Sequence, residues 1–114
     1  MKDDQIYLRH IQQAIEKIEK YVKPVEYEAF IANDMMFDAV VRELQVIGEA
    51  TKRFSENYKI SHKLVPWDAI AGFRNRAVHE YFDINALTVW ETVVYDLPEL
   101  KKMLGLPVGH EGED

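Results

Sequence analysis

The sequence contains no cysteine, and this absence removes several kinds of chemistry at once. Disulfide bonds, thiolate nucleophiles and cysteine-ligated zinc sites are excluded, which leaves histidine and carboxylate side chains as the remaining metal ligands. No segment approaches the roughly 20 consecutive apolar residues that are needed to cross a bilayer. The N-terminal residues 1–4 also lack the basic and then apolar pattern of a signal peptide. We therefore expect a cytoplasmic protein with no metal, no cofactor and no contact with a membrane.

Excess positive charge is also missing, because the 114 residues carry a formal net charge of −6. This balance argues against loose nucleic-acid binding through a strongly basic surface, although it is compatible with a local basic cleft. The length is typical of one domain with a single core. After Leu104 the composition shifts to glycine, proline and acidic residues. We predict one domain over residues 1–104 and a flexible acidic tail over residues 105–114.

Apolar residues recur at helical spacing along most of the chain, and no segment alternates with a period of two. The pattern predicts helices over about residues 3–22, 34–58, 66–82 and 86–104, with a short helical or irregular piece at 27–31 and a connector at 60–65. Pro24 ends the first helix, Asn33 or Asp34 caps the second, Pro66 opens the third, and Pro98 kinks or restarts the fourth. The sequence therefore predicts an all-α fold, an antiparallel up-and-down bundle of four to five helices.

Two details of this pattern concern packing. Gly48 lies in the middle of the long second helix, where glycine costs about 1 kcal/mol relative to alanine, so we expect another helix to approach closely there. The fourth helix has a predicted inner face, which consists of Leu87, Trp90, Val93, Val94 and Leu97.

The run from Arg74 to Tyr81 places an arginine in an apolar setting. On a helical wheel of about 100° per residue, the apolar residues of segment 66–82 share one arc, with Arg74 near its middle. These residues are Trp67, Ile70, Ala71, Phe73, Ala77, Val78 and Tyr81. Burial of an unpaired charge costs several kcal/mol or more, so the guanidinium must reach water, bind an anion or lie at an interface. Asn75 and His79 share the adjoining flank, one helical turn apart.

An arginine and a histidine are sufficient to promote the cleavage of RNA by its own 2′-hydroxyl. His79 can transfer a proton near neutral pH, and the Arg74 guanidinium can stabilise the charged phosphorane with two hydrogen bonds. Asn75 could orient either group. Tyr81 could donate a hydrogen bond to phosphate or be a site of modification.

Arg74 and His79 do not converge on an ideal helix, because five positions correspond to a rotation of about 140°. Either the helix distorts near His79, or the long side chains reach around it, or a two-fold dimer brings two copies of the motif into one cleft. We favour the dimer, which would also cover the aromatic residues Trp67, Tyr81 and Phe82, all three expected to be exposed.

Simpler interpretations exist for several of these residues. His79 could pair with Glu80 or Asp83. His10, His62 and His110 show no metal-ligand spacing, and we expect them to be solvated. Arg42 and Glu49 lie on the same side of the second helix, where a structural network with each other or with the motif arginine is the favoured interpretation.

The spacing of Arg74, His79 and Tyr81 resembles the signature of the HEPN superfamily, small helical-bundle ribonucleases and nucleotide-associated domains, and in particular its HepT toxin branch. Residues 40–50 and 65–75 resemble the long helix of that branch and its lead-in to the motif. The resemblance implies a homodimeric, metal-independent endoribonuclease that acts as the toxin of a toxin-antitoxin pair. Arg74 and His79 would be the catalytic pair, accompanied by Asn75.

The resemblance also implies a partner, a minimal nucleotidyltransferase that acts as the antitoxin. It would silence the toxin by transferring AMP from ATP to the motif tyrosine, Tyr81. Each added AMP brings a negative phosphate and a bulky nucleotide beside His79, which would repel RNA and block the cleft. The alternative is a non-catalytic HEPN module that docks a nucleotidyltransferase or binds a nucleotide at the same cleft. A purely structural bundle leaves Arg74 unexplained.

Overall fold

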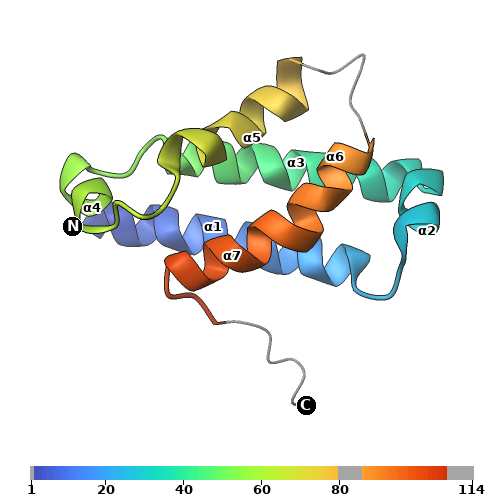
Figure 1. The fold of residues 1–114 in the computed structure, drawn as a ribbon, viewed down its shortest axis with the longest axis horizontal. Helices are drawn as coiled ribbons and strands as arrows, with labels where there is room; N and C mark the ends of the chain where they lie inside the picture. The colour runs from blue at the N-terminus through green and yellow to red at the C-terminus, as the bar shows by residue number, and fades with distance from the viewer. Residues whose placement is uncertain (1, 80–85, 108–114) are drawn as a thin grey trace.

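The computed structural model describes residues 2–79 and 86–107, and the side chains of residues 3–73 and 86–107. Every regular element in these ranges is helical (Figure 1). In chain order the elements are α1 (Lys2–Val22), α2 (Tyr27–Ala32), α3 (Asp34–Thr51), α4 (Glu56–Ser61), α5 (Trp67–His79), α6 (Ala86–Glu91), the π-helical turn η2 (Thr92–Asp96) and α7 (Leu97–Met103). The prediction of an all-α fold is confirmed.

The long helices alternate in direction, as the up-and-down prediction requires. In Figure 1, α1 and α3 run side by side, α5 lies on the other side of α3, and the rod formed by α6, η2 and α7 crosses them obliquely. The most extensive packing joins α3 to α1 and to α5. α3 is therefore the central helix, and α2 and α4 are short turns of helix at its two ends.

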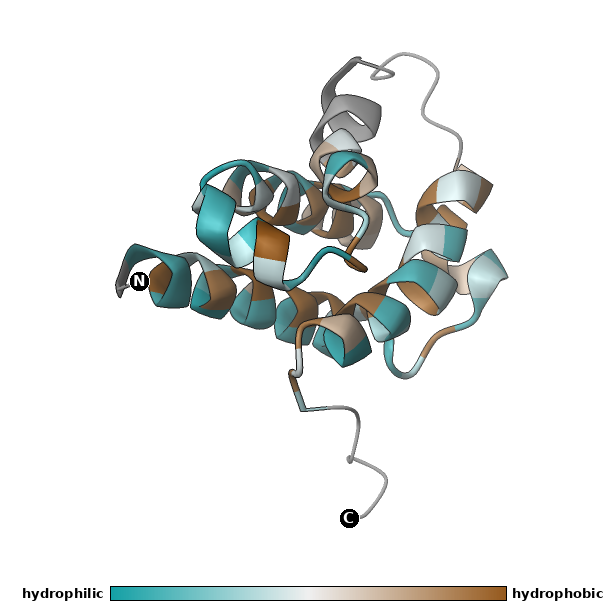
Figure 2. Cartoon of the chain, turned by 60° about the vertical axis from the view of Figure 1, so that its left-hand side comes forward, coloured by the Kyte–Doolittle hydropathy of each residue, from teal (hydrophilic) through white to brown (hydrophobic). Residues whose placement is uncertain are grey.

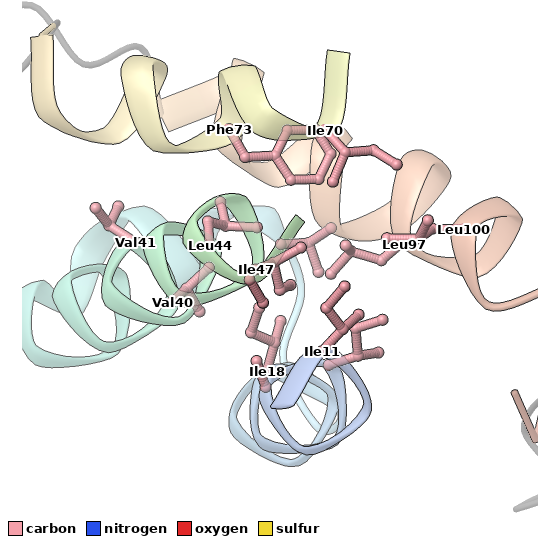
Figure 3. Close-up of a cluster of buried hydrophobic side chains, with 14 of the residues drawn as sticks. Ile11, Ile18, Val40, Val41, Leu44, Ile47, Ile70, Phe73, Leu97 and Leu100 are labelled. Atoms are coloured by element: carbon pink, nitrogen blue, oxygen red, sulfur yellow. The ribbon is translucent and has the colours of Figure 1, made fainter. Parts of the chain in front are cut away.

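The core lies where the inner faces of the four long segments meet. Ile11 and Ile18 of α1 point toward Ile47 of α3, and Leu97 and Leu100 approach from α7 (Figure 3). All five side chains are buried. Figure 2 shows apolar and polar residues in alternation along α1, as a helix with one inner and one outer face requires. None of the helices in the described part of the chain has the length and apolar character that crossing a membrane requires.

The predicted second helix is too long, because α3 ends at Thr51 instead of continuing to Tyr58. Ser55 caps a separate helix, α4, where its Oγ accepts a hydrogen bond from the backbone N–H of Tyr58 at 3.1 Å. The segment Glu56–Ser61 is therefore helical, and the predicted connector at 60–65 begins later than expected. At the other end, Asn33 is the cap of α3, since its Oδ1 accepts from Met36 N at 2.9 Å.

Asp4 fixes the start of α1 to this break between α3 and α4. Its carboxylate is buried and accepts hydrogen bonds from Ser55 N at 2.7 Å and from Ser55 Oγ at 2.6 Å. The bond from the Ser55 hydroxyl lowers the pKa of Asp4, and the backbone bond lowers it further, against the opposing effect of burial. Two residues 51 positions apart are thus joined by charge-assisted hydrogen bonds.

The inner face predicted for the fourth helix is confirmed in part, because Val93 and Leu97 are buried and Trp90 packs against the core. Leu87 and Val94, predicted to point inward, are 45% and 39% exposed, whereas Val89 and Thr92 are buried. Thr92 can enter the core because its Oγ1 donates to the carbonyl of Thr88 at 2.9 Å, so the hydroxyl keeps a hydrogen-bond partner. A pattern that counts threonine as polar therefore does not place Thr92 on the inner face.

Pro98 restarts this helix, as predicted. It occupies the first turn of α7, where its missing N–H is tolerated, and the π-helical turn lies directly before it. The helix then ends in a Schellman cap, with Gly105 at φ +71°, Gly105 N bound to Lys102 O at 3.1 Å and Leu106 N bound to Lys101 O at 2.9 Å. Gly105 and Leu106 belong to this cap rather than to the predicted tail, of which residues 108–114 lie outside the described residues.

Candidate functional site

Helix α5 carries the motif and is positioned by the residues at its start. Pro66 lies immediately before the helix, which therefore begins one residue later than predicted. The Pro66 carbonyl accepts the first helical hydrogen bond, from Ile70 N at 3.1 Å. Ile70 and Phe73 are buried and point toward α3 and α7 (Figure 3). The apolar arc predicted for this helix is thus confirmed at its first two turns.

The three predicted residues Arg74, Asn75 and His79 lie in the last turns of α5. Arg74 follows the buried Ile70 by four positions, which places its Cα one turn further along the side of the helix that packs on the bundle. The side chains of these three residues, and Tyr81 as a whole, lie outside the described residues. The end predicted for this helix at residues 83–85 lies outside them as well.

The backbone of α5 is α-helical through His79. A distortion of the helix between Arg74 and His79 is therefore not the way in which the two residues are brought together. Of the three alternatives, two remain: long side chains that reach around the helix, or a second copy of the motif.

Trp67 is not exposed, so the prediction that it is an exposed aromatic residue covered by a dimer partner is wrong. Its side chain is half-buried, and its Nε1 donates a hydrogen bond to the carbonyl of His62 at 3.1 Å. The ring lies 5.2 Å from that of Phe54 and 5.9 Å from that of Tyr58 between centroids. Trp67 therefore anchors the start of α5 to α4, while Tyr81 and Phe82 lie outside the described residues.

His62 is not simply solvated, which is a second correction. Its ring stacks on Tyr58 with centroids 4.1 Å apart and planes 9° apart, and its Nδ1 lies 3.0 Å from the Tyr58 carbonyl oxygen. Burial raises the pKa of Tyr58, and the negative charge of Asp4 raises it further. His10 is exposed, as expected, and makes an edge contact with Tyr7 at 5.9 Å. His110 lies outside the described residues.

The described side chains include no group of three or more histidine, aspartate or glutamate residues that could hold a metal ion. Arg42 and Glu49, for which a structural network is predicted, both line a groove between α1 and α3. This α1–α3 groove has a volume of about 450 Å³ and is lined by Tyr7, His10, Arg42, Gln45, Val46, Glu49, Ala50 and Arg53. The sequence gives no direct signal for it, because the groove exists only once α1 packs on α3.

A second hollow separates α5 from α7. It has a volume of about 290 Å³, an apolar floor that includes Ile70, Phe73 and Leu100, and the carboxylates of Asp96 and Glu99 on its rim. Carboxylates repel phosphate, so this side of α5 is unsuited to the RNA backbone.

Comparison with known proteins adds independent information. Residues 11–105 match the model of the family described as "Ribonuclease HepT-like". The chain is 39% identical over 104 residues, 91% of its length and 93% of the relative, to a candidate RNase of Caldanaerobacter subterraneus subsp. tengcongensis. It is 37% identical over 95 residues, 83% of its length and 86% of the relative, to "Probable ribonuclease HepT" of Thermococcus cleftensis.

A candidate RNase of Methanocaldococcus jannaschii is 40% identical over 101 residues, with 89% of this chain and 84% of the relative covered. No solved structure matches the chain significantly. The family model spans the helical bundle from α1 to the cap after α7, including the whole motif helix. By the extent of this match and the identity of these relatives, the chain belongs to the HepT-like ribonuclease family.

Proposed function

We propose that this protein is a metal-independent endoribonuclease and the toxin of a toxin-antitoxin pair. The observation that carries the proposal is the placement of Arg74 and His79 on one regular helix, α5, in a chain of the HepT-like ribonuclease family. Relatives named as ribonucleases support the activity. Attack by the 2′-hydroxyl needs proton transfer and charge stabilisation, which the motif histidine and arginine can supply without a metal.

In the proposed reaction, the 2′-oxygen of a ribose attacks the adjacent phosphorus and the bond from phosphorus to the 5′-oxygen breaks. His79 accepts the proton of the 2′-hydroxyl, and a proton is returned to the departing 5′-oxygen. The Arg74 guanidinium stabilises the additional negative charge on the phosphoryl oxygens, and Asn75 orients the pair. The products are a 2′,3′-cyclic phosphate and a free 5′-hydroxyl, so that no water is consumed in this step.

A homodimer supplies the geometry that one regular helix lacks. Arg74 and His79 are separated by about 140° on the helix, whereas a two-fold axis beside α5 places two motifs in one cleft. It also provides two histidines, so that His79 and the partner's His79 can act as base and acid in the same reaction.

The proposed regulator is a minimal nucleotidyltransferase that transfers AMP from ATP to Tyr81. Tyr81 lies two positions after His79, so an added nucleotide and its negative phosphate would occupy the cleft that RNA must enter. Co-expression with such a partner should yield protein that carries AMP, detected by intact mass and mapped to Tyr81 by the loss of labelling in Tyr81→Phe.

The experiment that tests the activity is incubation of the purified, unmodified protein with total RNA and tRNA in the presence of EDTA. Arg74→Ala and His79→Ala should both remove cleavage while retaining the helical circular dichroism spectrum and the dimer mass. Arg9→Ala and His110→Ala are the matched controls, because they remove the same side chains outside the motif and should leave cleavage unchanged. A folded His79→Ala dimer that cuts RNA at the wild-type rate would overturn the mechanism.

The alternative function is a non-catalytic module that docks a nucleotidyltransferase or binds a nucleotide at the same cleft. Growth separates the two: a toxin arrests cells when it is expressed alone, and the His79→Ala variant does not. Intact RNA in every lane, with protein shown by mass to be unmodified, favours the docking module.

A further inference from the structure

We propose that the α1–α3 groove binds the phosphate backbone of the single-stranded RNA substrate and guides the strand toward the motif helix. This inference rests on the proposed ribonuclease function and assigns a binding surface for its substrate. The residues that carry it are Arg42 of α3, Arg53 of the turn after α3, and Tyr7 and His10 of α1.

The two arginines line the same groove from different elements. Arg42 lies on α3, and Arg53 lies in the turn two positions after the end of that helix at Thr51. Both side chains are exposed at the groove. A guanidinium can bind a phosphate through two parallel hydrogen bonds, which favours arginine at such positions.

The α1 wall of the groove adds rings that suit the bases. Tyr7 is half-buried and His10 is exposed, and their rings meet edge to face at 5.9 Å. Single-strand binding surfaces combine a basic track with aromatic faces on which bases stack without regard to sequence. A volume of about 450 Å³ is large enough for part of a strand rather than for a single ion.

Charge distinguishes this groove from the hollow between α5 and α7. Among the described side chains, Arg42 and Arg53 outnumber Glu49 at this groove, whereas those that line the other hollow include Asp96 and Glu99 and no cationic group. In a protein of net charge −6, RNA requires a local excess of positive charge. The α1–α3 groove provides one on the described surface.

The groove also adjoins the helix that carries the motif. Val41 and Leu44 of α3 lie beneath Phe73 of α5, and the next positions along α3 are Arg42 and Gln45, which line the groove (Figure 3). Successive helical positions are turned by about 100°, so the groove and α5 flank neighbouring sides of α3. A strand in the groove thus lies beside the motif helix.

The test measures RNA binding apart from cleavage. In a His79→Ala background, Arg42→Gln/Arg53→Gln is compared with Lys20→Gln/Lys23→Gln, which removes the same charge from exposed positions at the far end of α1. The dissociation constant of a fluorescent single-stranded RNA is measured by anisotropy at several salt concentrations. We expect the slope of log affinity against log salt to be less steep by about 1.4 in the arginine variant, because each phosphate contact with a single strand contributes about 0.7. The lysine variant should keep the parent slope.

Three other results would overturn the groove assignment. Equal slopes for the two double variants, in a protein whose unmodified form cuts RNA, overturn the groove assignment and leave the proposed function in place. A halved mass of the arginine variant by light scattering overturns it as well, since the groove is then a contact between copies. If the parent neither binds nor cuts RNA, the proposed function fails first and the groove assignment fails with it.

Discussion

Lys101 of α7 offers a sharp test of the energetics of this bundle. Its ammonium group is buried, with 8% of the side chain exposed, and lies 2.7 Å from Glu19 Oε2 of α1, whose side chain is 44% exposed. Removal of Glu19 by Glu19→Ala leaves a buried charge without this partner. Breaking a buried ion pair costs about 3–5 kcal/mol. Because Glu19 is half-exposed and water can replace part of it, we expect about 2 kcal/mol.

Removal of the charge itself should be far less harmful. Lys101→Met keeps an unbranched side chain of similar length in an apolar site, so the free energy of unfolding should change by less than about 1 kcal/mol. The double variant Glu19→Ala/Lys101→Met should then resemble Lys101→Met alone, since no buried charge remains. The coupling free energy between the two positions is therefore also about 2 kcal/mol.

Urea denaturation followed by circular dichroism at constant protein concentration measures all four proteins. With m near 2 kcal/mol per molar, Glu19→Ala should lower the midpoint by about 1 M while m stays constant. The reasoning is refuted if Lys101→Met destabilises the protein more than Glu19→Ala does. That result would mean that the pair itself stabilises the fold more than an apolar replacement.

Two further predictions concern glycine and acid. Gly72→Ala should stabilise the protein by about 1 kcal/mol, because alanine favours the interior of α5 and no described atom lies within 4 Å of the added Cβ. Gly105→Ala should instead destabilise it by about 1 kcal/mol, because Gly105 has a φ of +71°. Thermal unfolding of the pair checks this, and equal shifts would contradict the argument. Because the pKa of Asp4 is lowered in the folded protein, its contribution to the free energy of unfolding is complete above the unfolded pKa near 4 and is lost as the pH falls through the folded pKa. Between pH 7 and 2, Asp4→Asn should therefore lose less of its free energy of unfolding than the parent does. Parallel losses in the two proteins would contradict a stabilising role of the Asp4 carboxylate.

The sequence predicts the long elements of the fold because helical spacing reports directly on burial. α1 is an example: Ile11, Ile15 and Ile18 recur at helical spacing in the sequence, and all three are buried. The prediction fails where a polar side chain forms a hydrogen bond with a nearby backbone group. Thr92 can be buried because its hydroxyl donates to the carbonyl of Thr88. Ser55 begins a new helix by accepting from Tyr58 N, at a point where the apolar pattern predicts that α3 continues.

The candidate site is predictable to the same extent. The positions of Arg74, Asn75 and His79 on one helix follow from their spacing, and α5 confirms that they share it. The α1–α3 groove does not follow, since His10 and Arg42 are 32 positions apart and approach each other only through packing. Nor does the role of Trp67, because a hydrogen bond to the carbonyl of His62 depends on the path of the preceding turn.

The contacts made by α1 also constrain how this protein can be synthesised. The start of α1 is bound to Ser55 through Asp4, and its far end is bound to Lys101 through Glu19. Between them, Ile11 and Ile18 belong to the same core cluster as Leu97 and Leu100, which are among the last core residues to leave the ribosome. α1 therefore cannot complete its packing until α7 has been synthesised, so the core forms only when nearly the whole chain has emerged. A shortened chain that ends before α7 leaves part of the inner face of α1 exposed.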